Sequence, residues 1–184
     1  ILEKINEEGR GREELPFWNE TLLSLSGKVH DYRTALVAFI NTHISLYGRE
    51  LNGADSVFEI DFKKNLVTYE RLIEYEPREI AAKMTLLGPA RDDFTVKLNE
   101  KSLNSYGSRG QQRTAVLALK LCEIDFITQE KNERPVLLLD DIFSELDEIH
   151  KQKVMSVINM QQTIITTADT SIKFPTKDLT ITQL

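Results

Sequence analysis

Four consecutive apolar residues followed at once by two aspartates constrain this chain more than any other feature. Val136 to Leu139 form the apolar run, and Asp140 and Asp141 close it. Such a run is typical of a strand buried in a parallel sheet. It places both carboxylates at the carboxyl edge of that sheet, where open α/β folds bind ligands. One carboxylate can hold Mg²⁺ while the next orients an attacking water, or the acids can simply cap the following helix.

The segments around this strand alternate between helix and strand patterns. A helix is predicted from about Gln111 to Thr128, another over Ser144 to Asn159, and a second apolar strand over Gln162 to Thr167. Alternation of this kind implies parallel strands joined by crossover helices. We therefore predict an α/β fold with a mostly parallel sheet.

The first half of the chain carries a different pattern. From Phe17 onward apolar residues recur at helical spacing, and Pro16 suits the first turn of a helix. This pattern predicts two helices, or one long bent helix, that form an arm. Val57 to Phe62 then alternates like a strand, and residues 70–84 return to a helical pattern that Pro77 interrupts.

Composition narrows the functional classes. The 184 residues carry a formal net charge of −6, which argues against a polyanion binder that acts through bulk charge, although a local basic groove fits within an acidic average. Arg71, Arg78 and Lys83 can line a DNA-facing surface or form an ordinary solvated helix face. The single cysteine, Cys122, cannot form an internal disulfide, and we expect a buried, reduced thiol in a cytoplasmic protein. No apolar run approaches the ~20 residues that span a bilayer, so no membrane contact is predicted.

A second motif precedes a helix rich in alanine and leucine. Residues 105–113 combine Gly107, Ser108 and Gly110. Glycines at a helix entry let backbone N–H groups and a serine hydroxyl approach an anion. The same residues also fit a glycine-rich turn with Ser108 as the helix N-cap. Their order, before the acidic strand and then Ser144 to Asp147, favours a nucleotide site.

In this order the motifs resemble those of ABC-type ATPases. Residues 108–113 resemble the signature loop, with Arg109 where the commonest version has glycine. Leu139-Asp140-Asp141 resembles the Walker B motif, and residues 144–147 resemble the D-loop. Thr166 to Asp169 lies where the switch segment follows, without its usual histidine.

Three features point within these ATPases to the RecF family, which is SMC-like and acts in DNA replication, repair and recombination. Residues 88–93 (Gly-Pro-Ala-Arg-Asp-Asp) resemble a RecF motif that usually has histidine at the position of Ala90. The Gln-Gln-Arg form of the signature loop and the Asp-Asp form of Walker B also fit. The resemblance implies a helical arm with a small β hairpin over residues 1–85, and the C-terminal part of an ABC-type P-loop ATPase lobe over residues 86–184.

The RecF resemblance also implies roles for particular residues. ATP hydrolysis would take place in an ATP-dependent homodimer with shared sites, where Asp140 would help hold Mg²⁺ and Asp141 would act on the attacking water. Asp147 would link the two sites. The family binds DNA at junctions between single and double strands and cooperates with RecR and RecO in loading RecA. Contacts to ATP are implied for Ser108, Arg109, Gly110, Gln111, Asp147 and Thr167.

A Walker A motif is the feature that this sequence lacks. Gly48 and Gly53 have the separation of G-x-x-x-x-G-K-[ST], but Ala54-Asp55 follow them instead of lysine and serine or threonine. In RecF-like proteins the motif lies near the N-terminus, and this chain starts at Ile1 within helix-like sequence. We therefore expect part of a longer protein that is inactive alone and binds ATP poorly or not at all. Two alternatives stay open: a degenerate, non-catalytic interaction module, and the nucleotide-binding subunit of a transporter, which the long arm disfavours.

Two further groups of polar residues give narrower predictions. Arg91 can reach a phosphate or pair with one of the two aspartates that follow it. His30, His43 and His150 share no metal-ligand spacing, so they are expected to be solvated or packed against helices.

Overall fold

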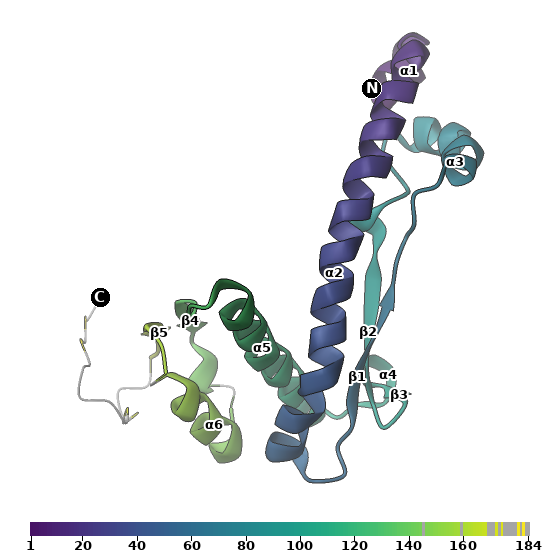
Figure 1. The fold of residues 1–184 in the computed structure, drawn as a ribbon. Helices are drawn as coiled ribbons and strands as arrows, with labels where there is room; N and C mark the ends of the chain where they lie inside the picture. Colours follow the sequence, from purple (N-terminus) through teal and green to yellow (C-terminus); the bar gives the residue numbers. More distant parts are fainter. Residues whose placement is uncertain are drawn as a thin grey trace. The chain divides into compact units, whose positions relative to one another are not determined.

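The computed structural model describes residues 1–144, 146–158 and 160–168, together with Ile172, Phe174, Thr180 and Thr182 (Figure 1). The α-helices are α1 (Leu2–Glu8), α2 (Leu15–Asn52), α3 (Tyr69–Ala82), α4 (Leu103–Tyr106), α5 (Arg109–Lys131) and α6 (Glu148–Ile158). Short 3-10 helices are η1 (Arg12–Glu14), η2 (Pro89–Arg91) and η3 (Ile142–Ser144). The strands are β1 (Phe58–Lys63), β2 (Asp93–Leu98), β3 (Lys101–Ser102), β4 (Leu137–Asp140) and β5 (Thr163–Thr166).

The chain forms two compact units. Unit 1 comprises residues 1–38 and 60–96, and unit 2 comprises residues 39–59 and 97–184. Because the boundaries fall inside α2, β1 and β2, each of these elements contributes residues to both units. The predicted division into an arm (residues 1–85) and an ATPase lobe (residues 86–184) stays a prediction.

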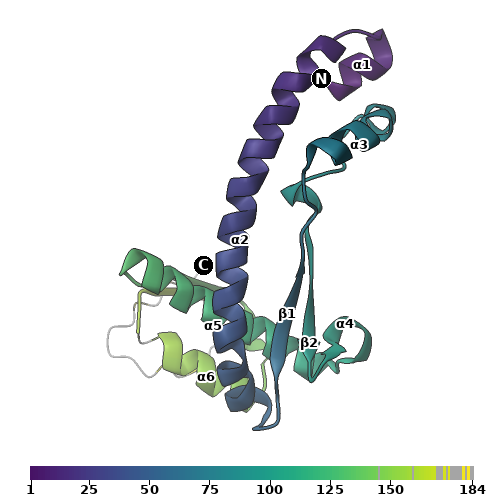
Figure 2. The same cartoon turned by 45° about the vertical axis from the view of Figure 1, so that its right-hand side comes forward.

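Helix α2 is one continuous helix of 38 residues rather than two (Figures 1 and 2). Pro16 lies in its first turn, where the missing N–H group would have no helical partner anyway. The helix ends where Gly53 takes a φ of 101° and its N–H group donates to the Arg49 carbonyl at 3.1 Å. A residue with a side chain rarely adopts that conformation, so glycine favours this helix end.

Unit 1 holds α1 and α3 together through a small apolar cluster of Ile5, Leu15 and Ile80. Helix α3 begins at Thr68, whose hydroxyl accepts a hydrogen bond from the Arg71 N–H group. The expected interruption at Pro77 is wrong, because the helix continues to Ala82. A proline inside a helix removes one N–H donor and crowds the carbonyl four residues before it, and the burial of Leu72 and Ile80 on either side of it stabilises the helical path against this cost.

A three-stranded sheet has the order β1–β2–β3, which confirms a small hairpin, although its strands β2 and β3 follow residue 85 instead of preceding it. Strands β2 and β3 are antiparallel, with Leu98 opposite Lys101. The two residues between them, Asn99 and Glu100, both have positive φ (48° and 67°), as two-residue hairpin turns of the mirror-image type require. In unit 2, Gly48 of α2 makes room for strand β1, because a Cβ there would overlap the Phe58 ring.

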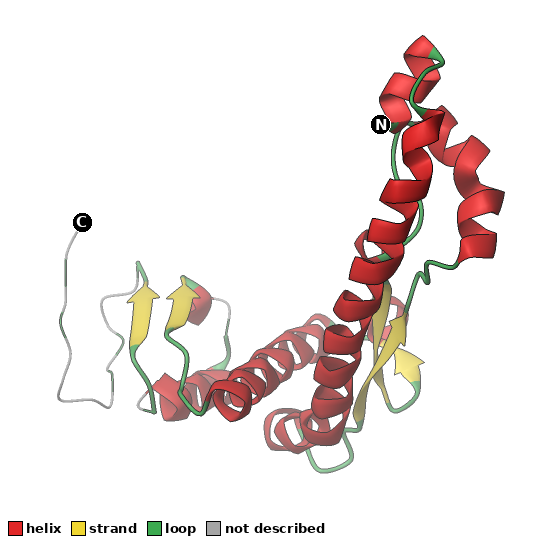
Figure 3. Ribbon diagram, turned by 45° about the horizontal axis from the view of Figure 1, so that its top comes forward, coloured by secondary structure: helices red, strands yellow, loops and turns green. Residues whose placement is uncertain are grey.

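Strands β4 and β5 of unit 2 are parallel, in register from Leu137 opposite Thr163 to Asp140 opposite Thr166 (Figure 3). This pairing confirms the predicted α/β alternation. The expectation of a fully buried strand is wrong for one face of the pair, where Leu138 is 70% and Ile164 is 55% exposed. Successive side chains point to opposite faces of a sheet, and no described segment covers the face that carries these two residues.

Helix α5 supplies much of the buried surface of unit 2. Leu117, Ala118, Leu121 and Cys122 are all buried along it. Cys122 is a free thiol, as predicted, and burial together with the nearby Asp125 carboxylate raises its pKa to about 12. The thiol is therefore protonated and unreactive at neutral pH. Within the described residues, no helix has the length and hydrophobicity to span a membrane.

Candidate functional site

The paired acids lie at the carboxyl edge of the parallel strands, as predicted. Asp140 is the last residue of β4 and stands opposite Thr166, the last residue of β5. The Thr166 hydroxyl donates to the Asp140 carboxylate. The same hydroxyl accepts a hydrogen bond from the Asp141 N–H group at 3.1 Å. One threonine therefore fixes both acids relative to β5.

Asp141 adopts a left-handed backbone conformation, with a φ of 45°. Its N–H group also donates to the Thr166 carbonyl at 3.1 Å, which holds the chain in this conformation. Aspartate tolerates the left-handed region better than most residues do. Residues other than glycine nonetheless adopt this conformation rarely outside turns and functional sites. The Asp141 side chain is exposed immediately beyond the strand.

An Mg²⁺ ion would fit this edge only with ligands from a nucleotide and from water. The described residues contain no cluster of three or more His, Cys, Asp or Glu that could hold a metal by themselves. Mg²⁺ in nucleotide sites usually takes one or two carboxylates, substrate phosphates and several waters. The exposed Asp140 carboxylate, fixed on one oxygen by Thr166, suits that role.

Thr166 is a site residue that the sequence reasoning missed. The predicted contact residue was its neighbour Thr167, which is exposed just beyond β5. The available signal was the strand register: a hydroxyl that ends β5 faces the acid that ends β4. Asp169, the last residue of the predicted switch segment, lies outside the described residues.

The predicted signature loop forms the start of α5, and Ser108 is its N-cap. The Ser108 hydroxyl accepts from the Gln111 N–H group at 3.2 Å, and the Gln111 side chain accepts from the Ser108 N–H group at 2.9 Å. This reciprocal capping box confirms the N-cap interpretation. The Gln112 amide adds hydrogen bonds to the carbonyls of Leu103 and Gly107, which hold the preceding turn against the helix.

The two glycines at the predicted signature loop, Gly107 and Gly110, differ in whether the fold itself requires glycine. A Cβ at Gly107 would overlap Leu103 and lie 2.6 Å from its carbonyl oxygen, so the fold itself requires glycine. A Cβ at Gly110 would meet only the Ser108 hydroxyl, at 3.9 Å. Alanine at such a helical position would be about 1 kcal/mol more favourable. The packing of the described chain does not explain Gly110, whereas close approach of a ligand to the exposed helix start would.

The predicted D-loop ends at Asp147, which caps α6. Its carboxylate accepts from the His150 N–H group at 3.0 Å and from the His150 ring at 2.6 Å. The backbone hydrogen bond, followed by the one from the ring, lowers the pKa of this exposed carboxyl below its usual value. Glu145, within the predicted D-loop, lies outside the described residues.

The predicted pairing of Arg91 with a neighbouring aspartate is wrong. Its guanidinium donates to the Thr85 carbonyl at 3.0 and 3.1 Å and lies 3.1 Å from the Met84 sulfur. The reason is that Asp92 turns towards α2. It accepts from His30 at 3.0 Å and from Arg33 at 2.7 Å.

The side chain of Asp92 is buried and fixes residues 88–93 to unit 1. The Asn65 N–H group also donates to it, at 2.7 Å. Burial disfavours the charged carboxylate, but the hydrogen bonds from Asn65, His30 and Arg33 outweigh it and lower the pKa of Asp92. Residues 88–93 are therefore anchored by a saturated carboxylate.

The histidines pack against other elements of the fold, as predicted. His43 lies over the Phe39 ring and bonds to the Phe39 carbonyl at 2.8 Å. His150 is buried in unit 2, and His30 contacts Asp92 in unit 1.

The basic residues of α3 and the lysine at its C-cap have partners within the chain. Arg71 and Arg78 both lie over the Tyr75 ring, 5.3 Å from its centroid, and Lys83 pairs with Glu7. These contacts position the three basic side chains on the surface of unit 1, and the choice between a DNA-facing surface and a solvated helix face stays a prediction.

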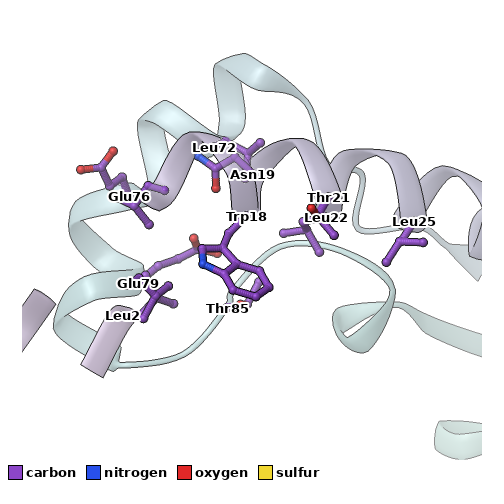
Figure 4. Close-up of a pocket in the computed structure, with 12 residues that line it drawn as sticks. Leu2, Trp18, Asn19, Thr21, Leu22, Leu25, Leu72, Glu76, Glu79 and Thr85 are labelled. Carbon is purple, nitrogen blue, oxygen red and sulfur yellow. The ribbon is translucent and has the colours of Figure 1, made fainter. Parts of the chain in front are cut away.

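Unit 1 contains a groove of about 370 Å³ that is not suited to a nucleotide (Figure 4). Trp18 and several leucines form its apolar walls, and its two carboxylates are Glu76 and Glu79. Glu79 already accepts hydrogen bonds from the N–H groups of Leu86 and Leu87. Carboxylates beside an apolar wall repel phosphate, so the candidate nucleotide site stays in unit 2.

Comparison with curated proteins finds relatives that share one name. No protein-family model matches the chain. The DNA replication and repair protein RecF of Ruminiclostridium cellulolyticum is 33% identical, over 90% of this chain and 48% of the relative. The protein of the same name from Lysinibacillus sphaericus is 46% identical, over 54% of this chain and 27% of the relative.

Two solved structures show the same fold. They are structures of the recombination mediator protein RecF in the RecFOR pathway, RecF-ATPrS and RecF-ATP, with TM-scores of 0.79 and 0.76. Sequence identities are 29% and 28%, over 95% and 94% of this chain and 50% and 49% of theirs. The chain spans about half the length of the curated relatives that it matches.

Proposed function

Because the chain belongs to the RecF family, we propose that it supplies the signature loop, the Walker B acids and the D-loop of a DNA replication and repair ATPase. The observation that carries the proposal is the pair Asp140–Asp141, held by Thr166 at the carboxyl edge of parallel strands. The exposed, capped start of α5 supports the proposal independently.

Asp140 and Asp141 have different roles in ATP hydrolysis. Asp140, oriented by the Thr166 hydroxyl, would hold Mg²⁺, which when bound would supply positive charge against the phosphates of ATP. Asp141 orients the attacking water and accepts its proton. Its backbone is fixed by two hydrogen bonds to Thr166, so little reorganisation is needed during the reaction.

The start of α5 acts on ATP held by a second subunit. The Ser108 oxygen accepts a hydrogen bond from the Gln111 N–H group. Its hydroxyl hydrogen is therefore free to donate to a phosphate oxygen. Capping and phosphate contact are therefore compatible. Arg109 is exposed and places a positive charge beside the helix start, and Gly110 leaves the backbone open to close approach. Gln111 orients Ser108.

The remaining assignments follow from family membership. Asp147, exposed at the start of α6, links the two sites across an ATP-dependent homodimer, and Thr167 contacts ATP from the β5 side. In the cytoplasm the dimer binds DNA at junctions between single and double strands and works with RecR and RecO in loading RecA. ATP binding closes the dimer on DNA, and hydrolysis releases it.

Substitution of Asp141 by asparagine tests the proposed chemistry. In the chain completed to the length of its RecF relatives, Asp141→Asn lowers the ATP hydrolysis rate by about 100-fold or more, because it removes the proton acceptor. The variant still binds ATP, so an ATP-dependent dimer accumulates, measurable by light scattering after gel filtration. Asp31→Asn, on the exposed face of α2, is the matched control. An Asp141→Asn protein that hydrolyses ATP normally, or stays monomeric with ATP, contradicts the proposal.

A further inference from the structure

A hydrogen-bonded chain of four residues joins the end of the D-loop to the start of α5, entirely within unit 2. The Asp147 carboxylate lies 2.6 Å from His150 Nδ1. His150 Nε2 lies 2.7 Å from the Thr114 hydroxyl, which lies 3.0 Å from the Gly110 carbonyl. His150 and Thr114 take no direct part in the proposed hydrolysis. They connect the D-loop and the start of α5, which both do.

The two middle members are buried, whereas the two ends are exposed. Thr114 and His150 are 1% and 6% exposed, while Asp147 and Gly110 face solvent. A buried polar pair is less favourable than an apolar pair of the same size unless its hydrogen bonds are made. The same helix shows that Thr114 does not need a histidine: Thr128 bonds to the Ile124 carbonyl in the same way, at 2.7 Å, without one.

The positions of the hydrogens couple the two ends. A carboxylate only accepts, so His150 Nδ1 donates to Asp147. The Thr114 hydroxyl has one hydrogen, which it can give to the Gly110 carbonyl or to His150 Nε2, but not to both. While the hydrogen of the neutral ring is on Nδ1, Nε2 is bare and the Thr114 hydroxyl donates to it; if Asp147 is engaged elsewhere and the ring hydrogen moves to Nε2, the Thr114 hydroxyl donates to the Gly110 carbonyl instead. A change at Asp147 that alters the ring therefore changes the hydrogen bond on Gly110.

We propose that His150 is a positioning residue that couples Asp147 of the D-loop to the first turn of α5 through Thr114. A subunit contact at Asp147 then sets how Gly110 and its neighbours are presented to a nucleotide. The inference rests on the proposed function for the meaning of the two ends, whereas the hydrogen-bonded chain itself does not depend on that function.

A double-mutant cycle on ATP hydrolysis tests the coupling in the full-length protein. Thr114→Val and Asp147→Asn lie at separate links, and asparagine keeps the helix cap. Thr114→Val lowers kcat by about 10-fold, the size expected for the loss of one buried hydrogen bond, and Asp147→Asn lowers it at least as much because it also alters the subunit contact. The double variant is no slower than Asp147→Asn alone, because both changes break the same chain. Thr114→Ser keeps the hydroxyl and retains near wild-type kcat, and Thr128→Val, which loses the matched hydroxyl, leaves kcat unchanged.

Two outcomes overturn the coupling while the wild type hydrolyses ATP: Thr114→Val at the wild-type rate, or single effects that multiply in the double variant. A wild type without ATP hydrolysis overturns the proposed function instead. The coupling is then decided by the ¹⁵N chemical shifts of the His150 ring. Thr114→Val shifts Nδ1 as well as Nε2, and Asp147→Asn shifts Nε2 as well as Nδ1. Shifts confined to the nearer nitrogen overturn it.

Discussion

The dipeptide Asp-Asp occurs twice in this chain, once in each unit, and the two copies have different surroundings. In unit 1 the Asp92 carboxylate is 4% exposed and accepts hydrogen bonds from a backbone N–H group, a histidine and an arginine. In unit 2 the Asp140 carboxylate is exposed and accepts one hydrogen bond, from the Thr166 hydroxyl. The same dipeptide therefore provides a buried structural carboxylate in unit 1 and an exposed carboxylate that can bind a ligand in unit 2.

The difference shows what decides the use of a carboxylate. Asp92 follows the 3-10 helix η2 and turns towards α2, so its donors saturate it and leave no room for a metal. Asp140 ends a parallel strand, where the chain must leave the sheet and the side chain meets solvent. Burial with several donors favours a structural role, and exposure at a strand end favours chemistry.

The largest contrast expected is in stability. Asp92→Asn leaves His30 and Arg33 facing a neutral amide in a buried position, and we expect it to lower the free energy of unfolding by about 3 kcal/mol. Asp140→Asn lies on the surface and should change the free energy of unfolding by less than about 0.5 kcal/mol. Urea denaturation of both variants measures the contrast. Equal losses of unfolding free energy in the two variants would show that the difference in exposure does not give Asp92 and Asp140 different roles in stability.

The two glycines of the signature loop extend the contrast within unit 2. Gly107→Ala overlaps Leu103 and should lower the free energy of unfolding by about 2 kcal/mol. Gly110→Ala should raise it by up to about 1 kcal/mol, since alanine suits a helix better. The same Gly110→Ala variant should weaken ATP-dependent dimerisation, because the added methyl occupies the open helix start. A Gly110→Ala protein that is both more stable and fully active would remove the argument for a ligand there.

A smaller effect is expected in the pH dependence of stability. The pKa of Asp92 is lowered in the folded state, so its stabilising contribution is complete above the unfolded value of about 3.9 and is lost as the pH falls through the folded value. The difference in unfolding free energy between the wild type and Asp92→Asn should therefore be constant from pH 7 to about pH 5 and shrink below about pH 4. Urea denaturation across this range checks it. A difference that grows on acidification would contradict a lowered pKa of Asp92.

Local patterns were sufficient to predict much of unit 2. The apolar run with its two acids predicted the parallel pair β4–β5, and the order of glycine and serine predicted a capped helix start at Ser108. Spacing of apolar residues also predicted a helical first region. In each case the pattern that carries the prediction lies within a few consecutive residues, as in the Ser108–Gln111 capping box.

The remaining features depend on contacts between distant parts of the sequence. His30 and Arg33 lie far before Asp92 along the chain, so no local pattern links them, and Arg91 was wrongly assigned an aspartate partner. Pro77 was expected to interrupt α3, but the tertiary packing of the helix outweighs the one hydrogen bond that it lacks.

The same limit applies to the site. Thr166 could be placed beside Asp140 only from the strand register, and the link from Asp147 to Gly110 needs α5 and α6 packed together. The exposed face with Leu138 shows the opposite limit: hydrophobicity predicted burial that the described residues do not provide.

In the proposed dimer, the start of α5 and the Walker B acids of one chain serve different nucleotides. Ser108→Asn keeps the helix cap and removes the hydroxyl, and Asp141→Asn removes the proton acceptor. Each full-length variant alone should be nearly inactive. When the two are mixed in equal amounts before ATP is added, half of the dimers contain one intact site, so hydrolysis should recover to about a quarter of the wild-type rate. A mixture that is no more active than its separate components would contradict the shared site.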